Sequence, residues 1–516
     1  MAPAQDETQP LLRSITNEGH QVYTSGDGAA AADEVTIVDF DPRGDPENPI
    51  DWPAPFKWAI VGMLAFMAFT VTMTCISIVP VASTIVRDLS PNSPSPETTS
   101  PGELKSATIL LVTIWELGEA AGPLLIAPLS ELVGRYPVMN CANLLFVLAG
   151  VLAATSGSVP QFVAARMLNG LAVAGNVLNP AIVGDMFVRE ERGAALSLLF
   201  LAPLVGGAFG PMIGSAVAER WGWRVVVWVM VGLAGTCETV FAVCFRETYK
   251  VAILRGRVKR MRGHAAGSGK TFKTVFDEVT EGEQTAGWKK LRDAVLRPAV
   301  VLMGSGVLVT MSLFSSVVFT FFYVYSTTFS DILLDLYQLS PVAVGSCFAT
   351  FSVGSTISVI ICNRALDRIY VRMRFLHKGV GKPEFRLPLA ILGAFALPLT
   401  VAAYGWAAEL RLPLLFLLFT VCAMGTALML AMIPVMAYVV DAFGLFSASA
   451  MTGIIVTRCL MSTFLPLTTA PLVDKLGYGW GFTTLAGFML LLAPIPMVML
   501  RYGAYWRKSS KYSRDA

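Results

Sequence analysis

The stretch SATILLVTIWELGEAAGPLLIAPLS, residues 106–130, is largely apolar and holds only two charged side chains, Glu116 and Glu119. About 20 apolar residues in a helix span the hydrocarbon core of a bilayer, so this stretch predicts a membrane-spanning helix. Of all 516 residues, 54% are hydrophobic and 15% are charged, against roughly 25% charged in soluble proteins. That balance leaves too little polar surface for water-soluble domains, and it indicates an all-α polytopic membrane protein.

Similar apolar runs recur along the whole chain. They cover 58–82, 106–130, 137–157, 161–186, 194–219, 224–245, 299–326, 341–363, 387–408, 412–440, 447–471 and 478–500. We therefore expect twelve transmembrane helices in two sets of six. The predicted parts are a disordered cytosolic tail (1–57), an N-terminal six-helix bundle (58–245), a basic cytosolic linker (246–298), a C-terminal six-helix bundle (299–500) and a cytosolic tail (501–516).

Lys and Arg are distributed unevenly between the loops. The segments 246–297 and 364–386 and the chain after residue 500 hold 25 of them, whereas the loops of the opposite side hold six. Because Lys and Arg accumulate in cytoplasmic loops, we expect both termini and the central linker on the cytosolic side. This orientation requires an even number of spans, and twelve satisfies it.

The first 57 residues are polar and acidic, and no apolar run precedes Trp58. We expect no cleavable signal peptide and an unstructured tail. Within the tail, Glu7-Thr-Gln-Pro-Leu11-Leu12 resembles an acidic dileucine sorting signal, although such short matches often arise by chance. The expected location is the plasma membrane, with the vacuolar membrane as the alternative.

The cysteine and histidine content excludes several classes of protein. All eight cysteines lie inside apolar runs, where free thiols behave as small hydrophobes, so no disulfide framework is predicted. His20, His264 and His377 lie in polar segments, which excludes a membrane enzyme with histidine-bound iron or zinc. We expect no enzyme activity, metal, cofactor or nucleic-acid partner, and a protein that works as a monomer.

Two acids in the second span are the first candidates for chemistry. Glu116 and Glu119 stand three residues apart and hence on one face of a helix. A carboxyl group at membrane depth is costly unless it is used, and burial favours its neutral form. The pair is therefore predicted to carry protons and to bind substrate, with a purely structural pair of acids as the alternative.

Two arginines lie in other spans. Arg166, in the fourth span, is the expected counter-charge for the acids, or else a guanidinium satisfied by backbone carbonyls. Arg458, in the eleventh, is expected either to contact substrate or to pack against a polar neighbour. Asp185 lies near a cytosolic end, where a gating or structural role is expected.

Further side chains are candidates for a substrate cavity. Asn176 and Asn179 are polar at depth in the fourth span, and Tyr323, Tyr325 and Met432 could line an adaptable apolar pocket. Aromatic and methionine side chains more often pack or face lipid. In the fifth span, small residues at Gly206, Gly210 and Gly214 would allow a close helix approach, and Pro211 a bend.

Several motifs jointly resemble the major facilitator superfamily, and in particular its fungal twelve-span drug:proton antiporters. Ala127-Pro-Leu-Ser-Glu131-Leu-Val-Gly134-Arg135-Tyr136-Pro137-Val138 resembles the loop signature after the second span, with Ala127 at a glycine position and Tyr136 at a basic one. Arg166-Met-Leu-Asn-Gly170 is similar to the fourth-span motif, and Gly206 to Gly214 to the fifth-span antiporter motif. The resemblance covers about 48–510.

The resemblance implies two six-helix bundles around a central cavity, alternating access and export driven by inward proton flow. Glu131 and Arg135 would form a cytosolic charge network, Gly134 would permit the tight loop, and Arg166 would serve proton coupling. The matching segment of the second half is degenerate and includes Asp367 and Arg368.

We therefore expect proton-coupled efflux of a small amphipathic compound such as a drug, toxin or secondary metabolite. Two alternatives remain, namely uptake of a nutrient or polyamine, and a membrane sensor that transports nothing. The acids could also bind a cationic substrate instead of, or besides, protons.

Overall fold

The computed structural model describes residues 35–41, 43–90, 101–173, 175–188, 191–264, 271–274, 287–508, 510 and 512–513. The chain divides into two compact units. One comprises Met1–Glu47 with Lys250–Gln284, and the other comprises Asn48–Tyr249 with Thr285–Ala516. The described residues of each unit are considered separately.

The smaller unit joins the N-terminal region to the linker between the two sets of spans. Strand β1 (Val35–Val38) pairs in parallel with β2 (Thr271–Thr274), and helix α9 (Lys250–His264) buries Leu254 in their shared apolar cluster. Arg257 of α9 forms an ion pair with Asp45, its Nη2 lying 2.8 Å from Oδ2. Burial alone would raise the pKa of Asp45, but the Glu47 N–H and Arg257 outweigh burial and lower it. Part of the predicted tail and linker is therefore structured; residues 1–34, which include the dileucine-like segment, lie outside the described residues.

The N-terminal half of the larger unit is built from the first six predicted spans. Its elements are η1 (Pro49–Asp51), α1 (Ala54–Ile76), η2 (Val79–Val81), α2 (Ala82–Leu89), α3 (Pro101–Val133), α4 (Arg135–Ala154), α5 (Val159–Leu171), α6 (Gly175–Met186), α7 (Arg192–Trp221) and α8 (Trp223–Cys244).

The C-terminal half follows the linker. Its elements are α11 (Gly287–Met303), α12 (Gly306–Asp331), the π-helix η3 (Ile332–Leu336), α13 (Pro341–Cys347), α14 (Ala349–Leu376), η4 (Pro383–Arg386), α15 (Pro388–Glu409), α16 (Leu414–Phe443), η5 (Gly444–Phe446), α17 (Ser447–Phe464), η6 (Leu465–Thr468), α18 (Thr469–Leu492) and α19 (Ile495–Lys508).

Each of the twelve predicted ranges falls on these helices, which confirms the all-α membrane architecture. Ten helical segments among the described residues are long and apolar enough to cross a membrane. The fourth range is divided between α5 and α6, of 13 and 12 residues, each too short by itself. The eleventh and twelfth ranges count as one segment, although Gly477 (φ 74°) interrupts α18 between them.

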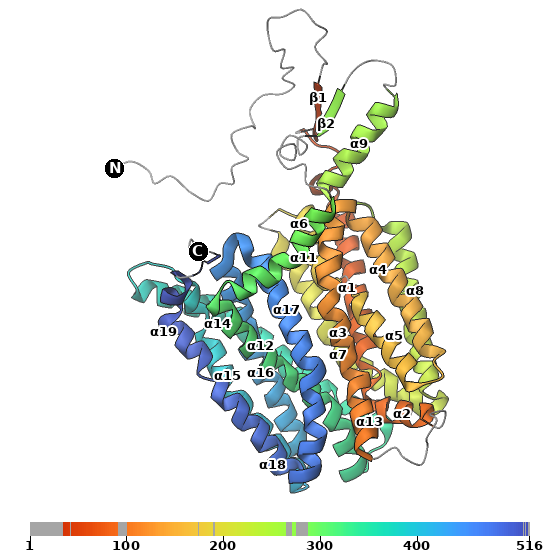
Figure 1. Ribbon diagram of the computed structural model, residues 1–516, viewed down its shortest axis with the longest axis vertical. Coiled ribbons are helices and arrows are strands. Elements are labelled where there is room, and N and C mark those ends of the chain that lie inside the picture. The colour runs from red at the N-terminus through yellow and green to blue at the C-terminus, as the bar shows by residue number, and fades with distance from the viewer. Residues whose placement is uncertain are drawn as a thin grey trace, which may run out of the picture. The chain divides into compact units, whose positions relative to one another are not determined.

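The two halves repeat one packing pattern. In the first half α1 packs on α7, α3 on α5, and α4 on both α5 and α8. The corresponding pairs of the second half are α12 with α17, α14 with α16, and α15 with both α16 and α18. The halves meet where α3 packs on α17 and where α7 packs on α13 and α14 (Figure 1). The contacts between the halves therefore follow the same twofold correspondence as the contacts inside them.

A row of glycines sets the distance between α1 and α7. A Cβ atom added at Gly206 would lie 2.6 Å from the Phe69 carbonyl oxygen, and one at Gly214 would lie 2.3 Å from that of Ser77. At Gly210, between them, the nearest backbone oxygen would be 3.0 Å away. The close approach predicted for this motif thus occurs against α1, while Pro211 follows Gly210 inside α7.

The tight loop between α3 and α4 depends on a further glycine. Gly134 has φ 116°, a backbone conformation that side chains with a Cβ rarely adopt. The chain can therefore end α3 at Val133 and begin α4 at Arg135 with one residue between them.

Candidate functional site

The two acids of α3 lie at the contact between the halves. Glu116 and Glu119 are both buried, with 2% and 8% of their surfaces exposed, respectively. Because they stand three positions apart in the helix, both project from the face of α3 that meets α17. The same contact holds a hydrogen bond in which the Thr113 hydroxyl donates to the Thr463 carbonyl at 2.9 Å. The acids are therefore enclosed between a helix of each half.

Glu116 is bound by a tyrosine of the other half. The Tyr323 hydroxyl of α12 donates a hydrogen bond to Glu116 Oε1 at 2.8 Å, and Tyr323 is itself buried. The second oxygen of Glu116, Oε2, has no hydrogen-bond partner among the described residues. One carboxylate oxygen is therefore held across the interface, and the other is buried without a hydrogen-bond partner among the described residues.

Glu119 pairs with an arginine of the other half. Arg458 Nη2 of α17 donates to Glu119 Oε1 at 3.3 Å. The Arg458 guanidinium also lies over the ring of Phe319, 4.2 Å from its centroid. Arg458 therefore packs against a polar neighbour, one of the two roles expected for it, and that neighbour is one of the candidate acids.

Arg166 makes different contacts. Its Nη2 donates to the Cys75 carbonyl at 2.9 Å and its Nη1 to the Thr74 carbonyl at 3.4 Å, both at the end of α1. The guanidinium lies over the ring of Trp115, 4.7 Å from its centroid. Its hydrogen bonds thus match the alternative in which backbone carbonyls satisfy the guanidinium. Trp115, which precedes Glu116 in the sequence, covers one face of that guanidinium.

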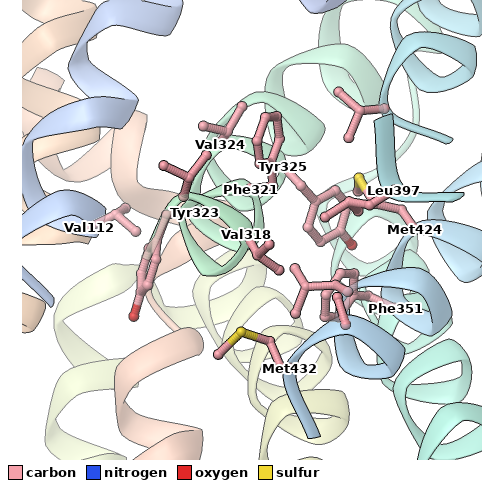
Figure 2. Close-up of a cluster of buried hydrophobic side chains, with 14 of the residues drawn as sticks. Val112, Val318, Phe321, Tyr323, Val324, Tyr325, Phe351, Leu397, Met424 and Met432 are labelled. Atoms are coloured by element: carbon pink, nitrogen blue, oxygen red, sulfur yellow. The ribbon is translucent and has the colours of Figure 1, made fainter. Parts of the chain in front are cut away.

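The aromatic and methionine candidates separate into two groups. Tyr323 reaches the acid cluster, whereas Tyr325 stacks on Phe351 at a centroid distance of 5.0 Å inside the C-terminal half. Met432 is also buried in that apolar core. Figure 2 shows Tyr323 on the side of α12 nearer Val112, with Tyr325 on the opposite side beside Phe351. Only the first of these three side chains touches a candidate acid.

The two asparagine candidates lie in α6. Asn179 is buried, and its Oδ1 atom has no hydrogen-bond partner among the described residues. Its side chain lies against the start of α6, where a Cβ atom on Gly175 would approach Asn179 Nδ2 to 3.1 Å. Asn176 belongs to α6 as well, but its side chain lies outside the described part of the chain. A cavity role for either asparagine stays a prediction.

At one end of the N-terminal half, charged groups join α4 to α6 and to the chain after α8. Arg135 Nε lies 3.4 Å from Asp185 Oδ2, and its guanidinium lies over the Tyr249 ring. Glu247 accepts hydrogen bonds from the backbone N–H groups of Arg135 and Tyr136, at 2.9 and 3.0 Å. The predicted partner Glu131 is exposed, so the contact of Arg135 is with Asp185.

An equivalent network occurs in the C-terminal half. Arg386 forms ion pairs with Asp367 of α14 and with Asp441 in the last turn of α16. Both carboxylates raise the pKa of Arg386 despite its burial. The buried Glu384 accepts a hydrogen bond from Arg507 Nε of α19 at 2.8 Å. The neighbouring Arg368 is exposed.

Sequence reasoning missed Glu247, Glu384, Arg386 and Arg507 as members of these networks. The signal that could have found them is positional: Glu384 and Arg386 lie at the start of the ninth span, and Glu247 and Arg507 lie after the sixth and twelfth spans.

One group of side chains has the donor types of a metal site. Among the described residues, ligand atoms of Glu116, Glu119 and Cys459 all lie within 4.8 Å of one another. The adjacent guanidinium of Arg458 supplies positive charge at the same place. One of the two carboxylates, Glu119, therefore already has a cationic partner in this group.

Comparisons with known proteins agree with this architecture. The family model of the Major Facilitator Superfamily matches residues 59–466. The chain is 29% identical over 513 residues to the MFS transporter cpaT of Aspergillus oryzae, covering 98% of this chain and 99% of that protein. It is 29% identical over 497 residues to the efflux pump radE of Floropilus chiversii, covering 95% and 89%.

Solved structures show the same fold. The xylose transporter XylE from E. coli, in a partially occluded inward-open conformation, superposes with a TM-score of 0.63 at 16% identity. The match covers 87% of this chain and 98% of XylE. The human organic anion transporter MFSD10 gives a TM-score of 0.58 at 17% identity over 86% of this chain and 100% of that one.

Proposed function

Because the chain belongs to the Major Facilitator Superfamily, whose members are transporters rather than enzymes, we propose that it exports a small amphipathic organic compound in exchange for protons. A drug, a toxin or a secondary metabolite is the expected cargo. The observation that carries this proposal is the pair of buried acids held by Tyr323 and Arg458 across the contact between the halves.

Proton coupling follows from the contacts of Glu119. The ion pair with Arg458 exists while Glu119 is charged, and a proton on the carboxylate removes the attraction between α3 and α17. Breaking a buried pair is unfavourable when one charge is left without a partner. Protonation therefore allows the two halves to separate at this contact, and loss of the proton favours their return. The affinity for a proton therefore differs between the state with the halves in contact and the state with them apart. A ligand can shift an equilibrium between two states only through such a difference in affinity.

Glu116 offers a place where protons and cargo compete. Its free oxygen lies at the same contact as Glu119, and Cys459 and Phe319 are close neighbours of the cluster. A cargo molecule that binds there would compete with the proton for Glu116 Oε2. Competition of this kind makes exchange, rather than joint movement, the favoured cycle.

The direction of transport and the type of cargo are proposed from the relatives. One is named an efflux pump, and another, 29% identical over 469 residues in Gibberella fujikuroi, is named the trichosetin biosynthesis cluster MFS transporter. These names support export of a secondary metabolite. The cytosolic placement of both termini and a plasma-membrane location are proposed from the loop charges, with the vacuolar membrane as the alternative, and we propose that a monomer suffices.

The charge networks at the helix ends are proposed to stabilise one conformation. Arg135 with Asp185 ties α4 to α6, and Arg386 with Asp367 and Asp441 ties α14, η4 and α16 together. These ion pairs must break or change partners if the helix ends that they join move apart.

The test uses the full-length protein in liposomes that contain a pH-sensitive dye, with a cargo chosen by a sensitivity screen of cells lacking the protein. Cargo added on one side should drive protons to that side, and dissipating the pH gradient should stop uphill cargo movement. Glu119→Gln should lower proton-driven transport at least ~100-fold, because the amide cannot exchange a proton in this range. Glu219→Gln, at an exposed carboxylate of α7, is the matched control and should transport normally.

Three results would contradict the proposal. Cargo and protons moving in the same direction would indicate uptake by symport, transport independent of the gradient would reject coupling, and wild-type pH dependence in Glu119→Gln would remove Glu119 from the proton path.

A further inference from the structure

Helix α11 carries apolar side chains on its outer face that play no part in the mechanism proposed above. Leu296, Val300 and Met303 are exposed, and their spacing in the helix places them on one face. Pro298 and Val301 are buried and lie on the opposite face. The helix therefore presents an apolar stripe that points away from the rest of the protein.

The same helix contacts both halves of the membrane unit. It packs on α12 and α17 of the C-terminal half and on α3 of the N-terminal half (Figure 1). Its approach to α17 is close, because a Cβ atom on Gly453 would lie 3.4 Å from the Pro298 carbonyl oxygen and from Leu302 Cβ. Since α3 and α17 also pack on each other, α11 lies at the seam between the halves, meaning the contact of α3 with α17.

Side-chain contacts anchor α11 to the C-terminal half. The Arg297 guanidinium lies over the ring of Phe446 in η5, 5.3 Å from its centroid. The Ser510 hydroxyl, after α19, donates to the carbonyl of Gly304 in the short link between α11 and α12, at 3.3 Å. If the halves separate at this end, the contact of α11 with α3 is therefore the one that must break.

The exposed face of α11 changes from charged to apolar along the helix. Arg292 and Asp293, which form an ion pair at 3.1 Å, are exposed and precede the apolar stripe. The stripe ends at Met303, just before the membrane-spanning helix α12. A helix that enters a leaflet from the headgroup region has this order of side chains. Exposure of the stripe to water would be unfavourable, so the face fits lipid.

We propose that the outer face of α11 docks in the adjoining lipid leaflet, and that this contact holds α11 across the seam. Leu296, Val300 and Met303 lie among the acyl chains, and Arg292 lies at the level of the headgroups. Separation of the halves at this end then requires α11 to move through the lipid or to release α3. The bilayer thus stabilises the closed seam alongside the ion pair of Glu119 with Arg458.

The depth of α11 can be measured with a fluorescent amino acid in place of Val300. The full-length protein is placed in nanodiscs of phosphatidylcholine with or without bromine on the acyl chains. Bromine quenches at short range, and the apolar face of an interfacial helix lies about 5–10 Å into the leaflet, so fluorescence should fall at least ~2-fold. The same amino acid in place of Arg292 should be quenched less.

The effect on the seam can be measured through Cys459 of α17, which is buried beside the acids of α3. Leu296→Gln with Met303→Gln should raise the rate at which a maleimide alkylates Cys459 at least ~5-fold, because two apolar side chains no longer favour the docked position. Val240→Gln with Val243→Gln in α8 is the matched control. Their exposures of 46% and 79% match the 49% and 79% of the first pair, but α8 packs on α1, α4 and α7 of its own half. The control should react at the wild-type rate.

Two results would overturn the proposal. Fluorescence at Val300 that bromine does not change would show that water or a second copy of the chain covers the stripe. Equal alkylation rates of Cys459 in the two double variants would show that α11 does not hold the seam. Neither measurement uses cargo or a pH gradient, so their failure is distinct from a failure of the proposed antiport.

Discussion

The two halves of the membrane unit share a packing pattern but contribute opposite groups to the contact between them. The N-terminal half contributes the carboxylates Glu116 and Glu119, and the C-terminal half contributes the hydroxyl of Tyr323 and the guanidinium of Arg458. The hydrogen bond to Glu116 and the ion pair of Glu119 both cross from one half to the other. The charges at this contact are therefore compensated only while the halves are together. A change in the charge of either carboxylate then changes the free energy of separating the halves.

The networks at the helix ends differ in a smaller way. In the N-terminal half Glu247 accepts hydrogen bonds from backbone N–H groups at the start of α4. In the C-terminal half the carboxylate lies at the other helix end of the pair: Glu384, at the start of the ninth span, pairs with the side chain of Arg507 after the twelfth. The first carboxylate complements the positive end of a helix, while the second forms a buried ion pair. The same two helix ends are thus joined in both halves, with the carboxylate on opposite sides of the contact.

The largest effect should come from removing the cation at the contact between the halves. Arg458→Gln leaves Glu119 buried without its partner, which should cost about 3 kcal/mol of stability and reduce proton-driven transport at least ~100-fold. Adding Glu119→Gln should restore most of the stability, because no uncompensated charge remains, but not the transport. Thermal unfolding in detergent and liposome flux of the three variants measure this. Additive losses in the double variant would show that the two side chains are not coupled.

The next effect separates the two helix-end networks. Glu384→Gln removes the carboxylate that pairs with the buried Arg507 and should destabilise the protein by about 2 to 3 kcal/mol, within the range for a hydrogen bond to a charged group. Glu247→Gln keeps one carbonyl oxygen for the backbone N–H groups and should cost about 1 kcal/mol. Unfolding temperatures of the two variants provide the comparison. Equal losses of stability in the two variants would mean that the two carboxylates contribute equally to the free energy of unfolding.

A smaller effect tests the close contact of α1 with α7. Gly214→Ala places a Cβ atom 2.3 Å from the Ser77 carbonyl oxygen, so a helix must shift, at a cost of about 1 to 2 kcal/mol. Gly232→Ala in α8 is the matched control, because nothing lies within 4 Å of its Cβ position. Alanine is the better helix former, so the control should be neutral or slightly stabilising. A Gly214→Ala protein as stable as its control would show that the close packing is dispensable.

The smallest effect concerns an exposed ion pair that also joins the halves. Lys105 of α3 pairs with Asp474 of α18, with side-chain exposures of 51% and 43%. Water and salt screen such a pair, so Lys105→Ala should change stability by less than about 0.5 kcal/mol. The same unfolding assay at low and high salt measures this. A loss comparable to that of Arg458→Gln would mean that burial does not decide the strength of contacts between the halves.

Much of the fold could be predicted because its causes are local. Runs of apolar residues set the helix ranges, while the tight loop at Gly134 was expected from the resemblance to the family's loop signature. The division of the fourth span into α5 and α6 was not predicted, since its apolar run continues across the break. Apolar composition shows that a segment can enter the membrane, but it does not show whether the helix inside is continuous.

The candidate site was predicted in part. The enclosure of Glu116 and Glu119 followed from their depth and spacing, whereas the partner of Glu119 did not. Arg166 was the expected counter-charge, yet its guanidinium donates to carbonyls of α1, and Arg458 meets the acid. Both arginines are cations in apolar spans, and the sequence alone does not show which of them contacts the acids of α3.

The sequence by itself determined which segments lie in the membrane and which polar side chains accompany them, because the free energy of transferring a residue into lipid depends on its own chemistry and that of its near neighbours. Tertiary structure alone decided the pairing of Glu119 with Arg458, 339 residues later in the chain, and of Glu116 with Tyr323, 207 residues later. Such pairs form when whole helices pack, and the fit of α3 against α12 and α17 is a property of all their surfaces together.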